Sequence, residues 1–150
     1  MSTYADTSFL VSLYIPDAHS AEAERRMAAS PIVWLTPFHV AEWTHAIEQQ
    51  VFRRAASQKE ADASHERFRQ HRENGLWLEV AMPESAFDLC AQLGRRHGAK
   101  LGLRTLDTLH VASALELKAE RFWTFDERQK KLARLVGLKT SGTENKALSS

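Results

Sequence analysis

Four acidic residues occupy positions from which their side chains could do chemistry together. Asp6 and Asp126 follow short apolar runs that are typical of buried strands, while Glu42 and Asp107 lie near the start of segments with helical spacing. Two like charges ~4 Å apart repel by about 4 kcal/mol at an effective dielectric constant near 20, so clustered carboxylates need a proton or a cation. Oxygen ligands suit hard ions such as Mg²⁺ or Mn²⁺. The four acids therefore indicate a divalent metal site, which could activate water to hydrolyse a phosphodiester.

Each acid also has a simpler structural explanation. Asp6 and Asp126 could be helix N-caps, a position at which Asp stabilises a helix by roughly 1 kcal/mol. Asp107 could complement a helix dipole, and Glu42 could be a solvated surface acid. Taken singly, each acid favours this explanation. Taken together, with Glu42 and Asp107 in apolar or small-residue surroundings, they favour a shared site.

The elements that must position these acids alternate along the chain. Apolar runs predict strands at 2–5, 32–35, 76–80 and 121–124, with a further edge strand at 136–139. Helical spacing and cap residues predict helices at 9–14, 18–29, 37–51, 57–73, 83–97, 105–118 and 126–135. We expect a loop at 98–102 and a helix cap at Thr105. Strands separated by helices form a mostly parallel sheet covered on both faces, and ligands bind at the edge where strands end and the next helices begin.

Length and composition are those of one domain. The 150 residues include 43% hydrophobic and 26% charged residues, which excludes a mainly disordered chain. Lys and Arg number 20 and Asp and Glu 19, so the net charge of +1 does not itself indicate a nucleic-acid-binding protein. Cys90 lies in an apolar helical pattern and is expected to be a buried thiol. We expect one domain at 1–140 and a flexible polar tail at 141–150, in a cytoplasmic protein without a signal peptide or membrane span.

Around the four acids the sequence resembles the PIN-domain family, and in particular the VapC-type toxins of bacterial toxin–antitoxin pairs. The matching stretches occur in family order at 4–8 (YADTS), 40–43 (VAEW), 107–114 (DTLHVASA) and 123–128 (WTFDER). None of these stretches is specific by itself. Their joint occurrence within 150 residues carries the resemblance.

The resemblance implies a three-layer α/β/α sandwich around a mostly parallel sheet. It implies a Mg²⁺- or Mn²⁺-dependent endoribonuclease that leaves a 5′-phosphate and a 3′-hydroxyl, with RNA as substrate. It also implies a homodimer and a small antitoxin protein that blocks the acidic groove. The residues that it assigns to the metal are Asp6, Glu42, Asp107 and Asp126. Three hydroxyl residues are expected near them, namely Thr7, Ser8 and Thr124.

A basic stretch without an acid precedes Asp107. It contains Arg95, Arg96, Lys100 and Arg104. One interpretation is a segment that holds RNA phosphates beside the metal site. The other is an ordinary basic helix end followed by a solvated loop, and the sequence favours the two equally. One turn after Asp107, His110 is expected to be a buried, hydrogen-bonded core residue rather than a site residue.

Other functions make different demands on the same residues. A PIN nuclease that processes RNA without an antitoxin would carry an identical site. A non-catalytic binding module, in which the acids only cap helices, would bind no divalent ion. A phosphatase needs a second acid two residues after its first, and Ser8 stands there after Asp6. His39 and His45 flank Glu42 without the H-E-x-x-H spacing, and no phosphate-binding glycine motif occurs, which disfavours a zinc protease and a nucleotide-driven enzyme.

Overall fold

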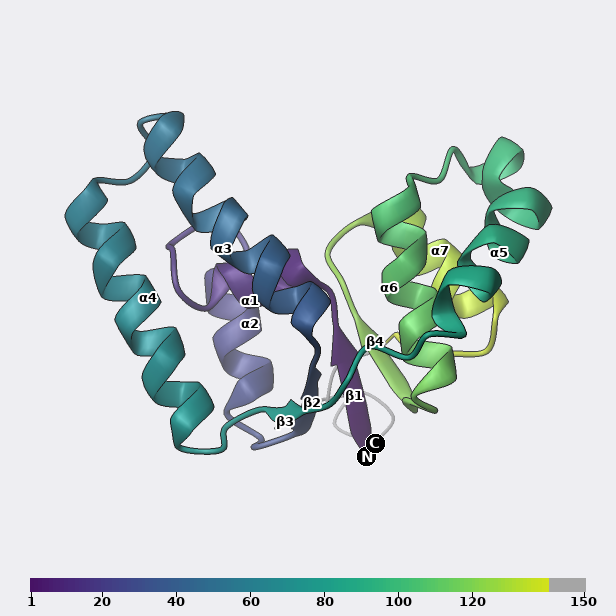
Figure 1. Ribbon diagram of the computed structural model, residues 1–150, viewed down its shortest axis with the longest axis horizontal. Coiled ribbons are helices and arrows are strands. Elements are labelled where there is room, and N and C mark those ends of the chain that lie inside the picture. The colour runs from purple at the N-terminus through teal and green to yellow at the C-terminus, as the bar shows by residue number, and fades with distance from the viewer. Residues whose placement is uncertain (141–150) are drawn as a thin grey trace, which may run out of the picture.

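A computed structural model describes residues 1–140 as three layers, with a four-stranded sheet between two groups of helices (Figure 1). The strands are β1 (Ser2–Ala5), β2 (Ile32–Leu35), β3 (Leu78–Glu79) and β4 (Arg121–Trp123). Their order in the sheet is β3-β2-β1-β4, and every pairing is parallel. The predicted α/β/α sandwich with a parallel central sheet is therefore confirmed.

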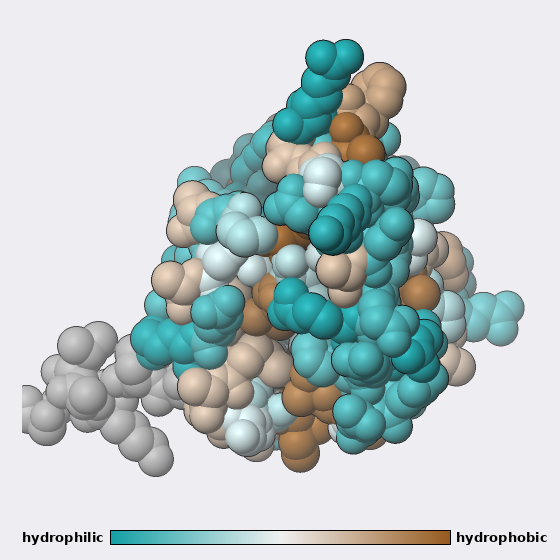
Figure 2. Space-filling view, turned by 90° about the vertical axis from the view of Figure 1, so that its left-hand side faces the viewer, coloured by the Kyte–Doolittle hydropathy of each residue, from teal (hydrophilic) through white to brown (hydrophobic). Residues whose placement is uncertain are grey.

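The helices divide between the two faces of the sheet (Figure 1). One face is covered by α1 (Thr7–Ser12), α2 (Ser20–Met27), α3 (Pro37–Phe52) and α4 (Gln58–Glu73). The other is covered by α5 (Ala86–Leu101), α6 (Thr105–Glu116) and α7 (Glu127–Leu135). On the outside of the first group, Figure 2 shows hydrophilic residues over most of the face that α4 presents.

The two central strands of the sheet and their neighbour β4 carry large apolar side chains that are buried on both faces of the sheet. Successive side chains of a strand point to opposite faces. Tyr4 and Phe122 accordingly pack into the hydrophobic core on the α5–α7 side, while Ala5 and Trp123 pack into the core on the α1–α4 side. All four side chains are 0% exposed. This double burial is the reason that parallel strands read as short continuous apolar runs.

Helix caps form at the places where two of the acids were predicted to lie. Asp6 caps α1 and its Oδ1 accepts a hydrogen bond from the backbone N of Phe9 at 2.8 Å. Asp126 caps α7 and its Oδ1 accepts one from the backbone N of Gln129 at 2.9 Å. Both residues are thus N-caps, and capping leaves the second oxygen of each carboxylate for other partners. Asp6 and Asp126 can therefore cap helices and also contribute to a shared site.

The structure corrects the prediction of a loop at 98–102. Helix α5 continues to Leu101 and ends at Gly102, whose φ of +66° is a left-handed conformation that favours glycine. Gly98 was expected to begin the loop, but packing of α5 against α6 outweighs its low helix propensity. The predicted cap is also wrong by one position: Arg104 is the N-cap of α6 and Thr105 is its first residue.

Two predicted strands are shorter than expected. The run at 76–80 pairs with β2 over Leu78 and Glu79. The run at 136–139 contributes one bridge, from Lys139 to Arg121. Within residues 1–140 no helix is long and apolar enough to cross a membrane. The predicted tail at 141–150 lies outside the described residues.

Candidate active site

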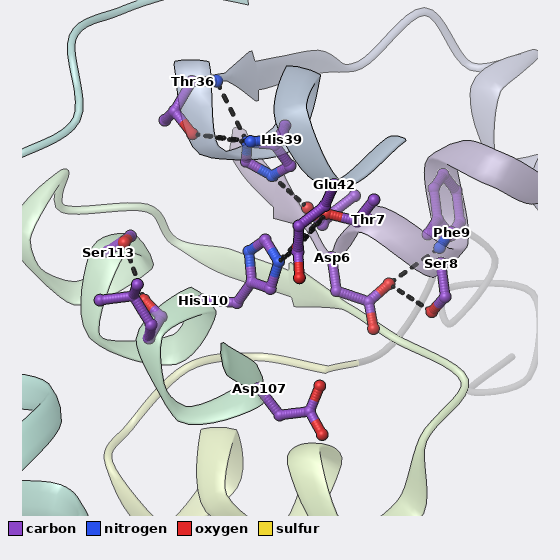
Figure 3. Close-up of polar contacts among 12 residues, drawn as sticks. Asp6, Thr7, Ser8, Phe9, Thr36, His39, Glu42, Asp107, His110 and Ser113 are labelled. Atoms are coloured by element: carbon purple, nitrogen blue, oxygen red, sulfur yellow. Dashed lines mark hydrogen bonds and ion pairs between the residues drawn. The ribbon is translucent and has the colours of Figure 1, made fainter. Parts of the chain in front are cut away.

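Five carboxylates line one cavity of about 470 Å³ where the strands end and the next helices begin. Four of them are the predicted acids: Asp6 after β1, Glu42 in α3, Asp107 in α6 and Asp126 before α7. The fifth, Asp17, lies between α1 and α2 and was not predicted. Figure 3 shows Asp6, Glu42 and Asp107 approaching this region from three different elements. Residues that are far apart in sequence therefore share one negative cavity.

The strand that carries Asp6 and the helix that carries Glu42 are joined by a buried histidine. His39 Nε2 lies 2.8 Å from the carbonyl oxygen of Ala5, and its Nδ1 accepts a hydrogen bond from the backbone N of Thr36 at 3.1 Å. Because Nδ1 is an acceptor here, Nε2 carries the hydrogen and donates it to Ala5. Burial, and to a lesser extent the nearby His110, lowers the pKa of His39 to about 3, so the ring is neutral. This neutral ring fixes the start of α3 against the end of β1.

Asp6 is the most deeply buried of the site acids, with 4% of its surface exposed. Its Oδ1 accepts hydrogen bonds from Ser8 Oγ at 3.0 Å and from the backbone N of Phe9 at 2.8 Å. Its Oδ2 lies 2.6 Å from Thr124 Oγ1. Burial raises the pKa of Asp6, although these hydrogen bonds and His110 oppose the shift. The surroundings of Asp6 therefore disfavour its charged form, while Ser8, Thr124 and the backbone N of Phe9 partly compensate for burial.

The hydroxyl of Thr124 connects three of the site acids. It carries one hydrogen but lies within hydrogen-bond distance of two oxygens, Asp6 Oδ2 at 2.6 Å and Gln129 Oε1 at 2.7 Å. It also accepts a hydrogen bond from the backbone N of Asp126 at 3.0 Å. The amide of Gln129 is oriented by its Nε2, which donates to the carbonyl oxygen of Asp107 at 3.0 Å. Gln129, which is 2% exposed, was not predicted as a site residue.

Glu42 is held by a chain of buried hydrogen bonds that reaches into the core (Figure 3). Its Oε1 accepts from Thr7 Oγ1 at 2.6 Å and from His110 Nε2. The hydroxyl of Tyr4 lies 2.8 Å from His110 Nδ1, and His110 Nε2 donates its hydrogen to Glu42. Burial opposes ionisation of Glu42, but the hydrogen bond and charge of His110 and the hydrogen bond of Thr7 outweigh it, so its pKa is lowered.

His110 has both properties that the sequence left as alternatives. It is 2% exposed, as expected for a core residue, and it lines the acidic cavity and contacts Glu42 directly. The expectation that it stays away from the site is therefore wrong. The three predicted hydroxyl residues each bond a site acid: Thr7 bonds Glu42, while Ser8 and Thr124 bond Asp6.

Asp107 forms an ion pair with a neighbour at the mouth of the cavity. Arg104 Nε lies 2.9 Å from Asp107 Oδ2, and 67% of the arginine side chain is exposed. An exposed pair of this kind contributes about 0–1 kcal/mol, so the guanidinium is easily redirected. Of the other basic residues in the predicted RNA-binding set, Arg95 lines a neighbouring cavity between α5 and α6, while Arg96 and Lys100 are exposed on α5.

The donor set of the acidic cavity fits a hard divalent ion, although no close ligand cluster is formed. Within residues 1–140, no three acidic, histidine or cysteine side chains surround a common point. Mg²⁺ is usually held by one or two carboxylates and keeps several waters, so such a cluster is not required. Glu42, Asp107 and Asp126 each engage one carboxylate oxygen with described groups and keep the other for an ion or its waters.

Comparison with known proteins identifies relatives of this fold. The model of the PIN domain family matches residues 3–135. The VapC20 toxin of Mycobacterium tuberculosis, which is described as cleaving the sarcin-ricin loop, is 17% identical with a TM-score of 0.70, over 94% of this chain and 99% of the toxin. FitAcB from Neisseria gonorrhoeae is 17% identical with a TM-score of 0.68, over 92% and 95% of the two chains.

VapBC2 from Rickettsia felis, which was solved with a DNA fragment from its promoter, is 15% identical with a TM-score of 0.62, over 94% and 98% of the two chains. No curated protein matches this chain. At these identities the structural matches establish a shared fold. The family model covers nearly the whole described chain and includes all four predicted acids. This chain therefore belongs to the PIN-domain family.

Proposed function

We propose that this protein is a Mg²⁺- or Mn²⁺-dependent endoribonuclease and the toxin of a toxin–antitoxin pair. The observation that carries the proposal is the convergence of Asp6, Glu42, Asp107 and Asp126 on one cavity of a PIN fold. Structural relatives that are described as a sarcin-ricin-loop-cleaving toxin and as VapBC2 bound to promoter DNA support the biological role.

The acids have distinct parts in this proposal. Asp107, Asp126 and Glu42 present free carboxylate oxygens to the cavity, and Asp6 supplies a buried charge at its base. These four residues would hold the ion. When bound, Mg²⁺ or Mn²⁺ would acidify a water and stabilise negative charge on the scissile phosphate.

The surrounding residues keep the acids oriented. His110 and Thr7 fix Glu42 through one oxygen, so that the other faces the cavity. Ser8 and Thr124 orient Asp6 through both of its carboxylate oxygens, Ser8 at Oδ1 and Thr124 at Oδ2. Arg104 is an exposed cation at the rim and could leave Asp107 to neutralise a substrate phosphate, which is the electrostatic stabilisation that phosphoryl chemistry requires.

The partners follow from the same proposal. RNA is the substrate, the protein is a homodimer in the cytoplasm, and a small antitoxin covers the acidic cavity. An antitoxin would compete with RNA for the carboxylates, so a stoichiometric complex should be inactive. Light scattering of the purified chain and co-purification with the product of a short adjacent reading frame test the dimer and the antitoxin. A PIN nuclease of RNA processing would cleave RNA but lack such a partner.

The test of the chemistry uses the full chain and a labelled RNA pool. Wild type should cut RNA with Mn²⁺ and not with excess EDTA, and the products should carry a 5′-phosphate and a 3′-hydroxyl. Asp6→Asn and Asp107→Asn should abolish cleavage while circular dichroism stays unchanged. Asp88→Asn, at an exposed acid in α5 outside the cavity, is the matched control and should cut normally. Full activity of both site variants, or activity in EDTA, would refute the proposal.

A further inference from the structure

A second cavity, of about 410 Å³, lies between α5 and α6 beside the acidic one. We call it the α5–α6 slot, and its lining includes Phe87, Gly94, Arg95, Gly98, Arg104 and Leu106. Arg104 lines both the slot and the acidic cavity. The two cavities are therefore neighbours that share one side chain. A volume of this size lies within the range of about 300–1,000 Å³ that is typical of small-ligand sites.

The charges of the two cavities are opposite. Five carboxylates line the acidic cavity, whereas none of the described residues that line the slot is acidic. The slot has two arginines instead, Arg95 and Arg104, and both are exposed. A polyanion that reaches the acids through a bound cation would therefore meet guanidinium groups as it continues into the slot. This alternation suits a nucleic-acid strand, in which phosphates follow one another along the backbone.

The slot also exposes an aromatic ring and an aliphatic side chain to solvent. Phe87 on α5 is 57% exposed and Leu106 on α6 is 52% exposed. An exposed aromatic face beside arginines is the combination on which proteins stack unpaired bases. Neither residue is needed to fill the core at this exposure. The slot thus has apolar walls and a cationic rim. The walls suit the base of a nucleotide, and the rim suits its phosphate.

Two glycines leave the slot open, and within residues 1–140 no packing contact requires them. Gly94 and Gly98 lie in the interior of α5, where glycine is among the least favourable residues. A Cβ added at either position would meet no atom of the described residues outside the helix itself within 4 Å. Neither glycine has the positive φ that would demand it. The space that they leave is part of the slot, so a larger side chain at either position would occupy it.

We propose that the α5–α6 slot binds one unpaired nucleotide of the RNA substrate, next to the phosphate held at the acidic cavity. The base packs against Phe87 and the glycine face of α5, and Arg95 and Arg104 contact the adjoining phosphate. This subsite rests on the proposed ribonuclease function. It makes the slot a determinant of which single-stranded segment is cut, because the base must leave its helix to enter.

The experiment fills the slot from within. Gly94→Leu and Gly98→Leu place an alkyl side chain where the base would lie, and Ala99→Leu adds the same side chain at an exposed position of α5 outside the slot. With a labelled single-stranded RNA and Mn²⁺, both glycine variants should raise KM at least tenfold, which corresponds to about 1.4 kcal/mol, with little change in kcat. Ala99→Leu should match wild type. Melting temperature and Mn²⁺ affinity should not fall in any of the three.

A second measurement identifies the nucleotide. Removing one base at a time from the RNA should weaken cleavage by wild type at a single position next to the cut, by about tenfold. The same abasic RNA should cause no further loss with Gly98→Leu, because the base no longer has a place. Phe87→Ala should give a loss similar to that of the abasic RNA.

The outcomes separate this subsite from the function on which it rests. If wild type shows no metal-dependent cleavage of any RNA, the ribonuclease proposal fails and the subsite fails with it. If wild type cleaves and both glycine variants cleave with unchanged KM, the subsite alone is refuted. If the glycine variants lose activity together with a dimer seen by light scattering, the slot holds a second copy of the chain, which also refutes a nucleotide.

Discussion

Replacing Asp6 by Asn should make the metal-free protein more stable. The structure places a carboxylate at 4% exposure, and burial raises its pKa. Asn is as good an N-cap as Asp, so the hydrogen bond from the backbone N of Phe9 is retained. The new amide can donate to Thr124 Oγ1, which frees the single hydrogen of Thr124 for Gln129 Oε1. Both neighbours of Thr124 are then satisfied.

The expected increase in stability has two contributions. One additional buried hydrogen bond is worth about 1 kcal/mol. Each unit by which the folded protein raises the pKa of Asp6 costs about 1.4 kcal/mol at neutral pH, and the substitution removes this cost. We therefore expect Asp6→Asn to increase the free energy of unfolding in EDTA at pH 7 by at least about 1 kcal/mol. Asp88→Asn, an exposed control, should change it by less than about 0.5 kcal/mol.

The pH dependence of the free energy of unfolding tests independently whether the carboxylate of Asp6 destabilises the metal-free protein. As pH rises past the usual carboxyl range near 4, the unfolded chain releases the Asp6 proton before the folded protein does. The folded state then binds more protons, so the stability of wild type should fall until pH passes the raised pKa. Asp6→Asn should lack this part of the pH dependence. Its advantage over wild type should therefore grow through that window and then level off.

Urea unfolding followed by tryptophan fluorescence measures this prediction, since Trp43, Trp77 and Trp123 are buried. Added Mn²⁺ should reverse the order of stability, because an ion at 100 times its dissociation constant stabilises wild type by about 2.7 kcal/mol and the variant much less. The reasoning is refuted if Asp6→Asn is less stable than wild type in EDTA, or if it keeps the same slope with pH.

Two further substitutions test the hydrogen bonds behind the acids. Tyr4→Phe keeps the ring but leaves His110 Nδ1 without its buried partner, so it should lower the free energy of unfolding by about 1–3 kcal/mol. Because His110 also holds Glu42, the substitution should weaken Mn²⁺ binding. Calorimetry that shows unchanged Mn²⁺ affinity would contradict this second effect. Gln129→Ala removes the hydrogen bonds to Thr124 and to the carbonyl oxygen of Asp107, and it should lower the free energy of unfolding measured by urea titration by about 2–4 kcal/mol. A decrease below about 1 kcal/mol would show that this amide does not support the site.

The sequence predicted those features that depend on local pattern. Asp6, Glu42, Asp107 and Asp126 could be placed together because parallel strands end at a common edge of a sheet. The layers followed from alternating apolar runs and helices. Helix ends were less certain, since glycine marks an end only when tertiary packing does not override it. Packing against α6 carries α5 through Gly98 to Leu101.

The residues that the sequence did not reveal make contacts across long distances in the chain. Asp17 enters the cavity because α1 ends early and the connection to α2 folds back toward the acids. His110 contacts Glu42 over a separation of 68 residues. Gln129 reaches the carbonyl of Asp107 from another helix. None of these contacts has a periodic signature, so only the folded arrangement shows them.

The position of β1 sets when a working site can exist. The first strand of the described residues, β1, lies between β2 and β4, and its pairing with β4 places Tyr4 opposite Phe122. Asp126 follows β4, so the negative cavity closes only after nearly the whole described chain has been synthesised. For a protein proposed to cut RNA, this order of assembly means that the four acids cannot act together before Asp126 has been synthesised and β4 has paired with β1.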